Sequence, residues 1–98
     1  MGKLESSFKA KLKAELKKEF EGCILIDLDP TMNQGIPDMM MLYKNKWAAL
    51  ECKRNKNAKR RPNQEYYVAR MNEMSYSSFI YPENKEDIIN ELREEFKS

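Results

Sequence analysis

Asp38, Glu51 and Lys53 are the residues of this 98-residue chain whose types and spacing best suit chemistry. Glu51 and Lys53 lie two positions apart inside an apolar run, so on a strand they share one face. The run at 36–43 contains Asp38 and can pair with the next run as a hairpin across a turn at 44–46. Asp38 then lies across from the region of Glu51, once a bulge absorbs an offset of one residue.

Two carboxylates and an ammonium at one end of a hairpin favour metal chemistry. Neighbouring carboxylates repel, raise each other's pKa, and are relieved by a shared Mg²⁺ or Mn²⁺, cations that take oxygen ligands. The backbone carbonyl of Cys52 can add a ligand, and Lys53 can position a metal-activated water or neutralise developing negative charge. In the alternative, Glu51 and Lys53 form a surface ion pair on an edge strand. Asp38 would then only cap a turn after Pro37.

The periodicity of apolar residues predicts the elements that must position this site. A first amphipathic helix covers 4–20, where an apolar residue recurs at every fourth position. A second helix opens at Pro62 and runs to about 74, and a last helix carries Ile88, Ile89, Leu92 and Phe96. Strands are predicted at 23–28, 36–43, 47–53 and 77–81.

The order of these elements predicts a fold of the α/β class with an α+β mixed sheet. The first three strands are expected to form an antiparallel meander, and the step through the second helix makes the last pairing parallel. The strand at 23–28 is expected to be buried, because it is apolar and bounded by turn residues. In the hairpin turn, Asn45 is the residue expected to take a positive φ.

Length and composition narrow the function classes. The chain has room for a single domain over 1–98, and it contains no histidine, which excludes a Ser/His/Asp triad, HNH chemistry and most zinc sites. Cys23 and Cys52 lie in apolar runs and are expected to be buried thiols, as in an intracellular protein. No membrane-spanning run or signal peptide is recognisable, so a cytoplasmic location is expected and no membrane partner is predicted.

The spacing of the candidate residues is similar to that of a known family. Pro37-Asp38, twelve intervening residues and Glu51-Cys52-Lys53 match the PD…ExK pattern, so the chain resembles the PD-(D/E)XK nuclease superfamily. The resemblance implies a restriction-endonuclease-like core in the order α-β-β-β-α-β-α and Mg²⁺-dependent hydrolysis of phosphodiesters. It also implies a catalytic role for Asp38, Glu51 and Lys53. Cys52 departs from the family, because it replaces the usual apolar middle residue.

A second stretch, 59–68, narrows the resemblance to virus-type replication-repair nucleases and Holliday-junction resolvases, particularly small phage-encoded nucleases. In such relatives a glutamine at the start of this helix lies beside the active site, which implies a site role for Gln64. Its alternative role is solvation of the helix. Glu5 borders the buried stripe of the first helix and can look towards the site. Alternatively, Glu5 is a first-turn glutamate favoured by the helix dipole.

The loop that follows the apolar run is strongly basic and contains no acid. Six cations are expected to neutralise DNA phosphates without reading sequence: Lys53, Arg54, Lys56, Lys59, Arg60 and Arg61. Alternatively, the loop only keeps the sheet soluble.

We expect a Mg²⁺-dependent DNA endonuclease that prefers branched or distorted duplexes, because no appended domain reads bases. A homodimer or a higher homo-oligomer would suit symmetric cuts across a junction, as in DNA recombination or repair. If the chain is phage-encoded, it would act in the host cytoplasm. The alternatives are a phage nicking or homing-type endonuclease with sequence preference, and a non-catalytic nucleic-acid-binding module.

Overall fold

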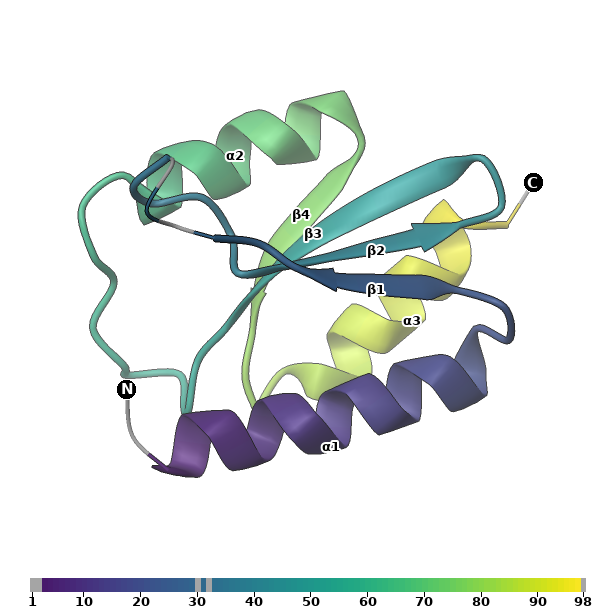
Figure 1. The fold of residues 1–98 in the computed structure, drawn as a ribbon, viewed down its shortest axis with the longest axis horizontal. Coiled ribbons are helices and arrows are strands. Elements are labelled where there is room, and N and C mark those ends of the chain that lie inside the picture. Colours follow the sequence, from purple (N-terminus) through teal and green to yellow (C-terminus); the bar gives the residue numbers. More distant parts are fainter. Residues whose placement is uncertain (1–2, 30, 32, 98) are drawn as a thin grey trace.

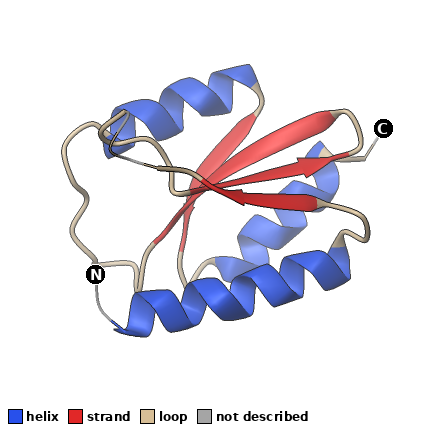
Figure 2. Cartoon of the chain, viewed as in Figure 1, coloured by secondary structure: helices blue, strands red, loops and turns tan. Residues whose placement is uncertain are grey.

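The computed structural model describes residues 3–29, 31 and 33–97, and for the first helix it describes side chains from Ser6 onward. These described residues form three helices and four strands in the predicted order α-β-β-β-α-β-α. The elements are α1 (Lys3–Glu19), β1 (Ile24–Asp27), β2 (Met39–Tyr43), β3 (Lys46–Cys52), α2 (Gln64–Met74), β4 (Tyr76–Ile80) and α3 (Lys85–Glu95). Figures 1 and 2 show α1 and α3 on one side of the sheet and α2 on the other.

The sheet is mixed, as predicted. Its strand order is β1-β2-β3-β4, with antiparallel pairing from β1 to β3 and parallel pairing between β3 and β4. The parallel step is the crossover through α2, because a helix is needed to bring the chain back in the same direction. β3 is therefore a central strand, paired on both sides.

The β2–β3 hairpin is tighter than the sequence predicted. Tyr43 pairs directly with Lys46, so the turn has two residues, and Lys44 rather than Asn45 takes the positive φ, at 58°. No bulge is needed to align the site. Because Met39 pairs with Leu50, continuing the same register by one step places Asp38 opposite Glu51.

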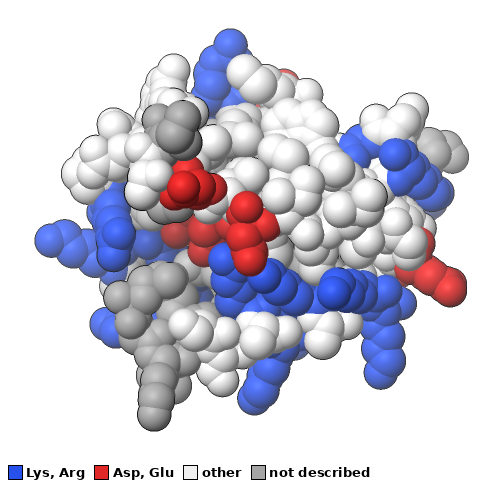
Figure 3. Space-filling view, viewed as in Figure 1, with Lys and Arg blue, Asp and Glu red and all other residues white. Residues whose placement is uncertain are grey.

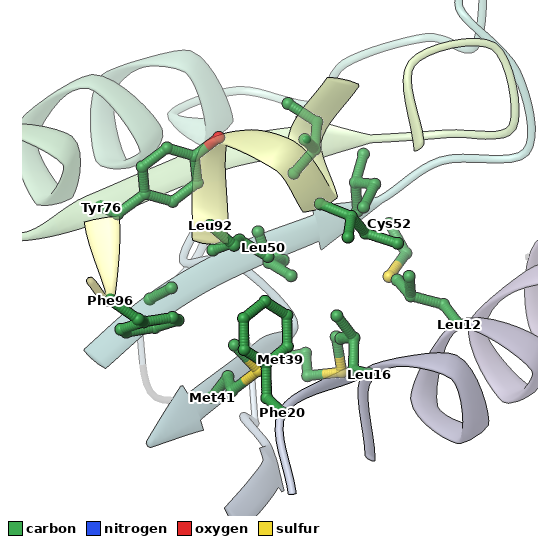
Figure 4. Close-up of a cluster of buried hydrophobic side chains, with 14 residues drawn as sticks. Leu12, Leu16, Phe20, Met39, Met41, Leu50, Cys52, Tyr76, Leu92 and Phe96 are labelled. Carbon is green, nitrogen blue, oxygen red and sulfur yellow. The ribbon is translucent and has the colours of Figure 1, made fainter. Parts of the chain in front are cut away.

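The hydrophobic core lies between the sheet and the helices α1 and α3 (Figure 4). Leu12, Leu16 and Phe20 form a buried stripe, because residues four positions apart lie on one side of a helix. Alternating residues of β3, Ala48, Leu50 and Cys52, point into the same core. Ala49, Glu51 and Lys53 consequently face the α2 side of the sheet.

The prediction that the first strand is buried was wrong. β1 is an edge strand whose side chains Ile24 and Ile26 are 58% and 39% exposed. The exposure of β1 depends on the packing of α2, an element distant in the sequence. This helix packs on β3 and β4 and does not extend over β1. Cys52 is fully buried as expected, whereas Cys23 next to this strand is only half-buried, and the two cysteines form no disulfide.

The second helix begins at Gln64, two residues later than predicted. Asn63 takes a left-handed conformation with φ 70°, so Pro62 lies in a turn before the helix instead of in its first turn. The backbone N–H of Arg61 donates to the Gln64 side-chain oxygen (2.8 Å), which closes this turn. Gly35 packs against the same turn, because a Cβ there would lie 2.6 Å from the Cβ of Asn63. The loop before β2 and the start of α2 thus meet closely.

Candidate active site

A cavity of about 110 Å³ lies where the loop before β2, the end of β3 and the start of α2 meet. The predicted site residues Asp38, Glu51 and Gln64 all line it. The remaining lining residues are Gln34, Gly35, Ile36 and Arg61. Residues distant in the sequence are therefore brought together at one end of the sheet, as the hairpin pairing and the helix start require.

Glu51, Gln64 and Lys53 form one buried polar network. The Gln64 amide nitrogen donates to Glu51 Oε2 (3.0 Å), and Lys53 Nζ donates to Gln64 Oε1 (2.9 Å). Lys53 Nζ also donates to the carbonyl of Lys59 (3.1 Å) and lies 3.7 Å from Glu51 Oε2. The Gln64 amide thus links the carboxylate to the ammonium and fixes both side chains.

Burial of this network excludes the alternative of a surface ion pair on an edge strand. Glu51, Lys53 and Gln64 are only 5%, 6% and 7% exposed, and β3 is paired on both sides. Removing an ion pair from water costs several kcal/mol per ion before any attraction offsets it, so such a pair is a weak source of stability. Glu51 and Gln64 line the cavity, and Lys53, which does not line it, is held next to them by its hydrogen bond to Gln64. Buried charges fixed in this way beside a cavity are typical of functional sites.

Asp38 is held at both of its carboxylate oxygens. Its Oδ1 accepts a hydrogen bond from the backbone N–H of Cys52 (3.3 Å), and its Oδ2 lies 3.7 Å from Lys9 Nζ. The side chain of Cys52 points into the core, so only its backbone carbonyl could serve as the predicted metal ligand. These contacts also argue against Asp38 being only a turn cap, since it is bonded across the hairpin to β3.

The donor set fits Mg²⁺. Mg²⁺ is usually bound through one or two carboxylates and keeps several waters, and Asp38 and Glu51 supply two carboxylates at one small cavity. Within the part of the chain that the structure describes, no group of three carboxylate or cysteine side chains lies at metal-binding spacing. The side chain of Glu5, the remaining predicted site residue, lies outside the described part.

The basic loop is exposed beside the cavity, except at its first residue. Arg54, Lys56, Lys59, Arg60 and Arg61 are exposed, whereas Lys53 is buried in the network described above. Arg60 stacks on the Phe79 ring (3.8 Å to the centroid) and pairs with Glu65 (2.9 Å).

A surface depression of about 580 Å³ lies along this loop and the start of α2. Its lining residues are Lys59, Arg60, Arg61, Pro62, Asn63, Glu65 and Tyr66. This depression shares Arg61 with the cavity lined by Asp38 and Glu51. Cations and an exposed tyrosine therefore lie next to these carboxylates, an arrangement suited to a phosphate backbone.

Lys9, Lys13 and Asp27 are charged neighbours of the site that the sequence did not single out. Lys9 Nζ lies 3.3 Å from Asp27 Oδ1, and Lys13 Nζ lies 2.8 Å from the same oxygen. Burial lowers the pKa of Lys9, but Asp38 and Asp27 raise it more, so its pKa is above the ordinary value. Figure 3 shows acidic side chains grouped on this face with basic side chains along their border. The one available sequence signal was the spacing of Lys9 and Lys13, one helical turn apart.

Comparisons of the chain with protein-family models, with curated proteins and with solved structures find no match. Separately, among the residues described here, none of the helices has the length and apolar character needed to cross a membrane.

Proposed function

We propose that this protein is a Mg²⁺-dependent DNA endonuclease with a PD-(D/E)XK-type active site formed by Asp38, Glu51 and Lys53. The observation that carries this proposal is that Asp38, Glu51 and Gln64 line one cavity. The hairpin register, continued by one residue beyond the Met39–Leu50 pair, places Asp38 opposite Glu51. The element order α-β-β-β-α-β-α and the mixed sheet support the family resemblance.

In this proposal each side chain has a distinct task. A bound Mg²⁺ would supply a Lewis acid and a water of lowered pKa. Asp38 and Glu51 would hold the cation, with Asp38 oriented by the Cys52 N–H and Glu51 by the Gln64 amide. Lys53 stabilises the negative charge that develops as water attacks phosphorus and the P–O bond breaks. Its ammonium is already fixed by Gln64 and the Lys59 carbonyl, so little reorganisation is needed.

The buried network favours an enzyme over a non-catalytic nucleic-acid-binding module. Binding to a phosphate backbone needs exposed cations only, and Arg54, Lys56 and Lys59 supply them. A buried Glu51-Gln64-Lys53 network adds nothing to such binding. A catalytic role for the site would explain why this network is present.

We infer that the enzyme recognises the shape of its DNA substrate, such as a branched or distorted duplex. Recognition of a base sequence, as by a nicking or homing enzyme, is the alternative. The groups available to DNA are backbone-binding cations, and no helix of the described chain stands out from the domain to enter a groove. The exposed Ile24 and Ile26 on an edge strand support self-association of the chain. A twofold dimer would have two symmetry-related active sites, one for each of two paired cuts in the DNA.

A cleavage panel tests this proposal. Labelled junctions, flaps, nicked duplexes and linear duplexes are incubated with the wild type and with Asp38→Asn, in Mg²⁺ and in chelator. We expect Mg²⁺-dependent cleavage by the wild type, strongest on the branched substrates, and none by Asp38→Asn. Cleavage that persists in chelator, or an Asp38→Asn variant as active as the wild type, would refute the assigned site. DNA binding without any cleavage would favour the binding module.

A further inference from the structure

The ammonium of Lys9 contacts two carboxylates, those of Asp27 and Asp38. Lys9 belongs to α1, yet its Nζ lies 3.7 Å from Asp38 Oδ2 and 3.3 Å from Asp27 Oδ1. Its side chain is only 20% exposed. Asp27 ends β1, and Asp38 immediately precedes β2, so Lys9 bridges carboxylates on neighbouring segments. The part of α1 that passes beneath the site thereby supplies a cation to it.

The Lys9 ammonium contacts the same carboxylate, that of Asp38, to which a metal ion would bind. The Cys52 N–H binds Oδ1 of Asp38, and Oδ2 is the oxygen nearer to Lys9. A divalent cation bound by Asp38 would lie close to an ammonium with which it shares an anionic ligand. Like charges repel strongly where solvent is restricted, so the two cations compete for the same carboxylate.

Asp27 offers the ammonium a second position. It is 59% exposed, lies closer to Lys9 than Asp38 does, and is also paired with Lys13 at 2.8 Å. Lys9 can therefore leave Asp38 without losing an anionic partner. Lys13 shares that partner.

We propose that Lys9 is a built-in counter-ion of Asp38 which a divalent cation must displace, and that Asp27 is the positioning residue which receives it. The inference rests on the proposed function, because it takes Asp38 to be a metal ligand. Lys9 then stabilises the metal-free protein and lowers its affinity for the metal. Asp27 raises that affinity by drawing Lys9 away.

The two effects of Lys9 have opposite signs, which makes them separable. Lys9→Met keeps most of the apolar stem and removes the charge. Without metal, Asp38 loses a cationic neighbour, so we expect a lower melting temperature in chelator. With metal, the competitor is gone, so we expect Mn²⁺ to bind more tightly by about fivefold or more, as for coupled binding events in general. Asp27→Asn should weaken Mn²⁺ binding, because Lys9 is left with Asp38 alone.

Mn²⁺ binding to the whole chain can be measured without DNA, from the loss of the free-ion signal in electron paramagnetic resonance. Lys13→Met is the matched control, since it lies one turn along the same helix and pairs with Asp27. We expect it to change Mn²⁺ affinity by less than about twofold, as for an exposed ion pair. Asp38→Asn defines binding at the site.

The outcomes distinguish the inference from the proposed function. If Asp38→Asn abolishes Mn²⁺ binding while Lys9→Met leaves it unchanged or weaker, the inference is overturned and the proposed site stands. If Asp38→Asn binds Mn²⁺ as well as the wild type does, the metal site fails and the inference fails with it. Tighter binding by Lys9→Met, together with a lower melting temperature in chelator, would support both.

Discussion

At the scale of single residues, Gln64 connects the two charges of the site. Its amide nitrogen donates to Glu51, and its oxygen accepts from Lys53 Nζ and from the N–H of Arg61. The sequence resemblance implied a site role for Gln64, and this role stays a prediction; the structure shows its side chain buried at the cavity between Glu51 and Lys53. The role of Lys9 was not predictable, because it depends on where α1 passes beneath the end of the sheet.

We expect Gln64→Ala to destabilise the protein and to slow cleavage. Removal of the amide takes one hydrogen bond from buried Glu51 and one from buried Lys53, and a hydrogen bond to a charged group contributes about 1.5–3 kcal/mol. Urea unfolding measures the stability, and single-turnover cleavage measures the chemistry. Glu65→Ala is the control, because it removes only the exposed pair with Arg60, worth at most about 1 kcal/mol. Equal losses in the two variants would contradict the role assigned to Gln64.

At the scale of elements, local patterns predicted more than long-range ones. The alternation in β3 was enough to predict that Glu51 and Lys53 share a face, and four-residue spacing was enough to predict the buried stripe of α1. The burial of β1 was mispredicted, because it depends on which strands α2 covers. The start of α2 was mispredicted because Asn63 adopts a left-handed conformation, which proline statistics do not anticipate.

The loop before β2 is expected to tolerate no side chain at Gly35. A Cβ there would lie 2.6 Å from Asn63 Cβ and 2.8 Å from its backbone carbon, so the loop or the start of α2 must shift. Because both segments line the cavity, we expect Gly35→Ala to impair Mn²⁺ binding and cleavage in addition to stability.

Gly22→Ala is a matched control for that variant. Gly22 has a φ of +91°, close to the +98° of Gly35, but a Cβ at Gly22 has no atom within 4 Å. Both variants carry backbone strain of about 1–2 kcal/mol, and only Gly35→Ala adds a clash beside the site. Thermal melts and Mn²⁺ titration compare them. Similar Mn²⁺ affinities for the two variants would show that the close approach of Gly35 and Asn63 does not shape the cavity.

At the scale of the whole molecule, charge is distributed unevenly although the net charge is only +2. The exposed cations of the basic loop lie beside the cavity that contains Asp38 and Glu51. The positive charge of this loop was predictable from the sequence, because residues 53–61 include six cations and no acid. Its position relative to the carboxylates required the fold, because the loop joins the end of β3 to the start of α2.

Arg60→Ala and Arg61→Ala are expected to weaken binding to every DNA substrate by a similar factor. Each loses about one phosphate contact, so the slope of log K against log salt should flatten by about 1. Fluorescence anisotropy over a salt series, in Ca²⁺, measures this. Arg70→Ala is the control, because Arg70 is an exposed α2 arginine paired with Glu73 and does not line the depression. Unchanged slopes for Arg60→Ala and Arg61→Ala would place the DNA elsewhere.

The buried ammonium of Lys53 gives the most direct test of the proposed active site. Single-turnover cleavage in Mg²⁺ and DNA binding in Ca²⁺ are measured for the wild type, Lys53→Ala and Lys53→Arg. We expect Lys53→Ala to slow cleavage by about 10²-fold or more while binding changes little, because the charge acts in the transition state. Lys53→Arg should also be slow, since a planar guanidinium cannot replace a compact ammonium between Gln64 and the Lys59 carbonyl. A folded Lys53→Ala protein that cleaves at the wild-type rate would contradict the assignment of this site.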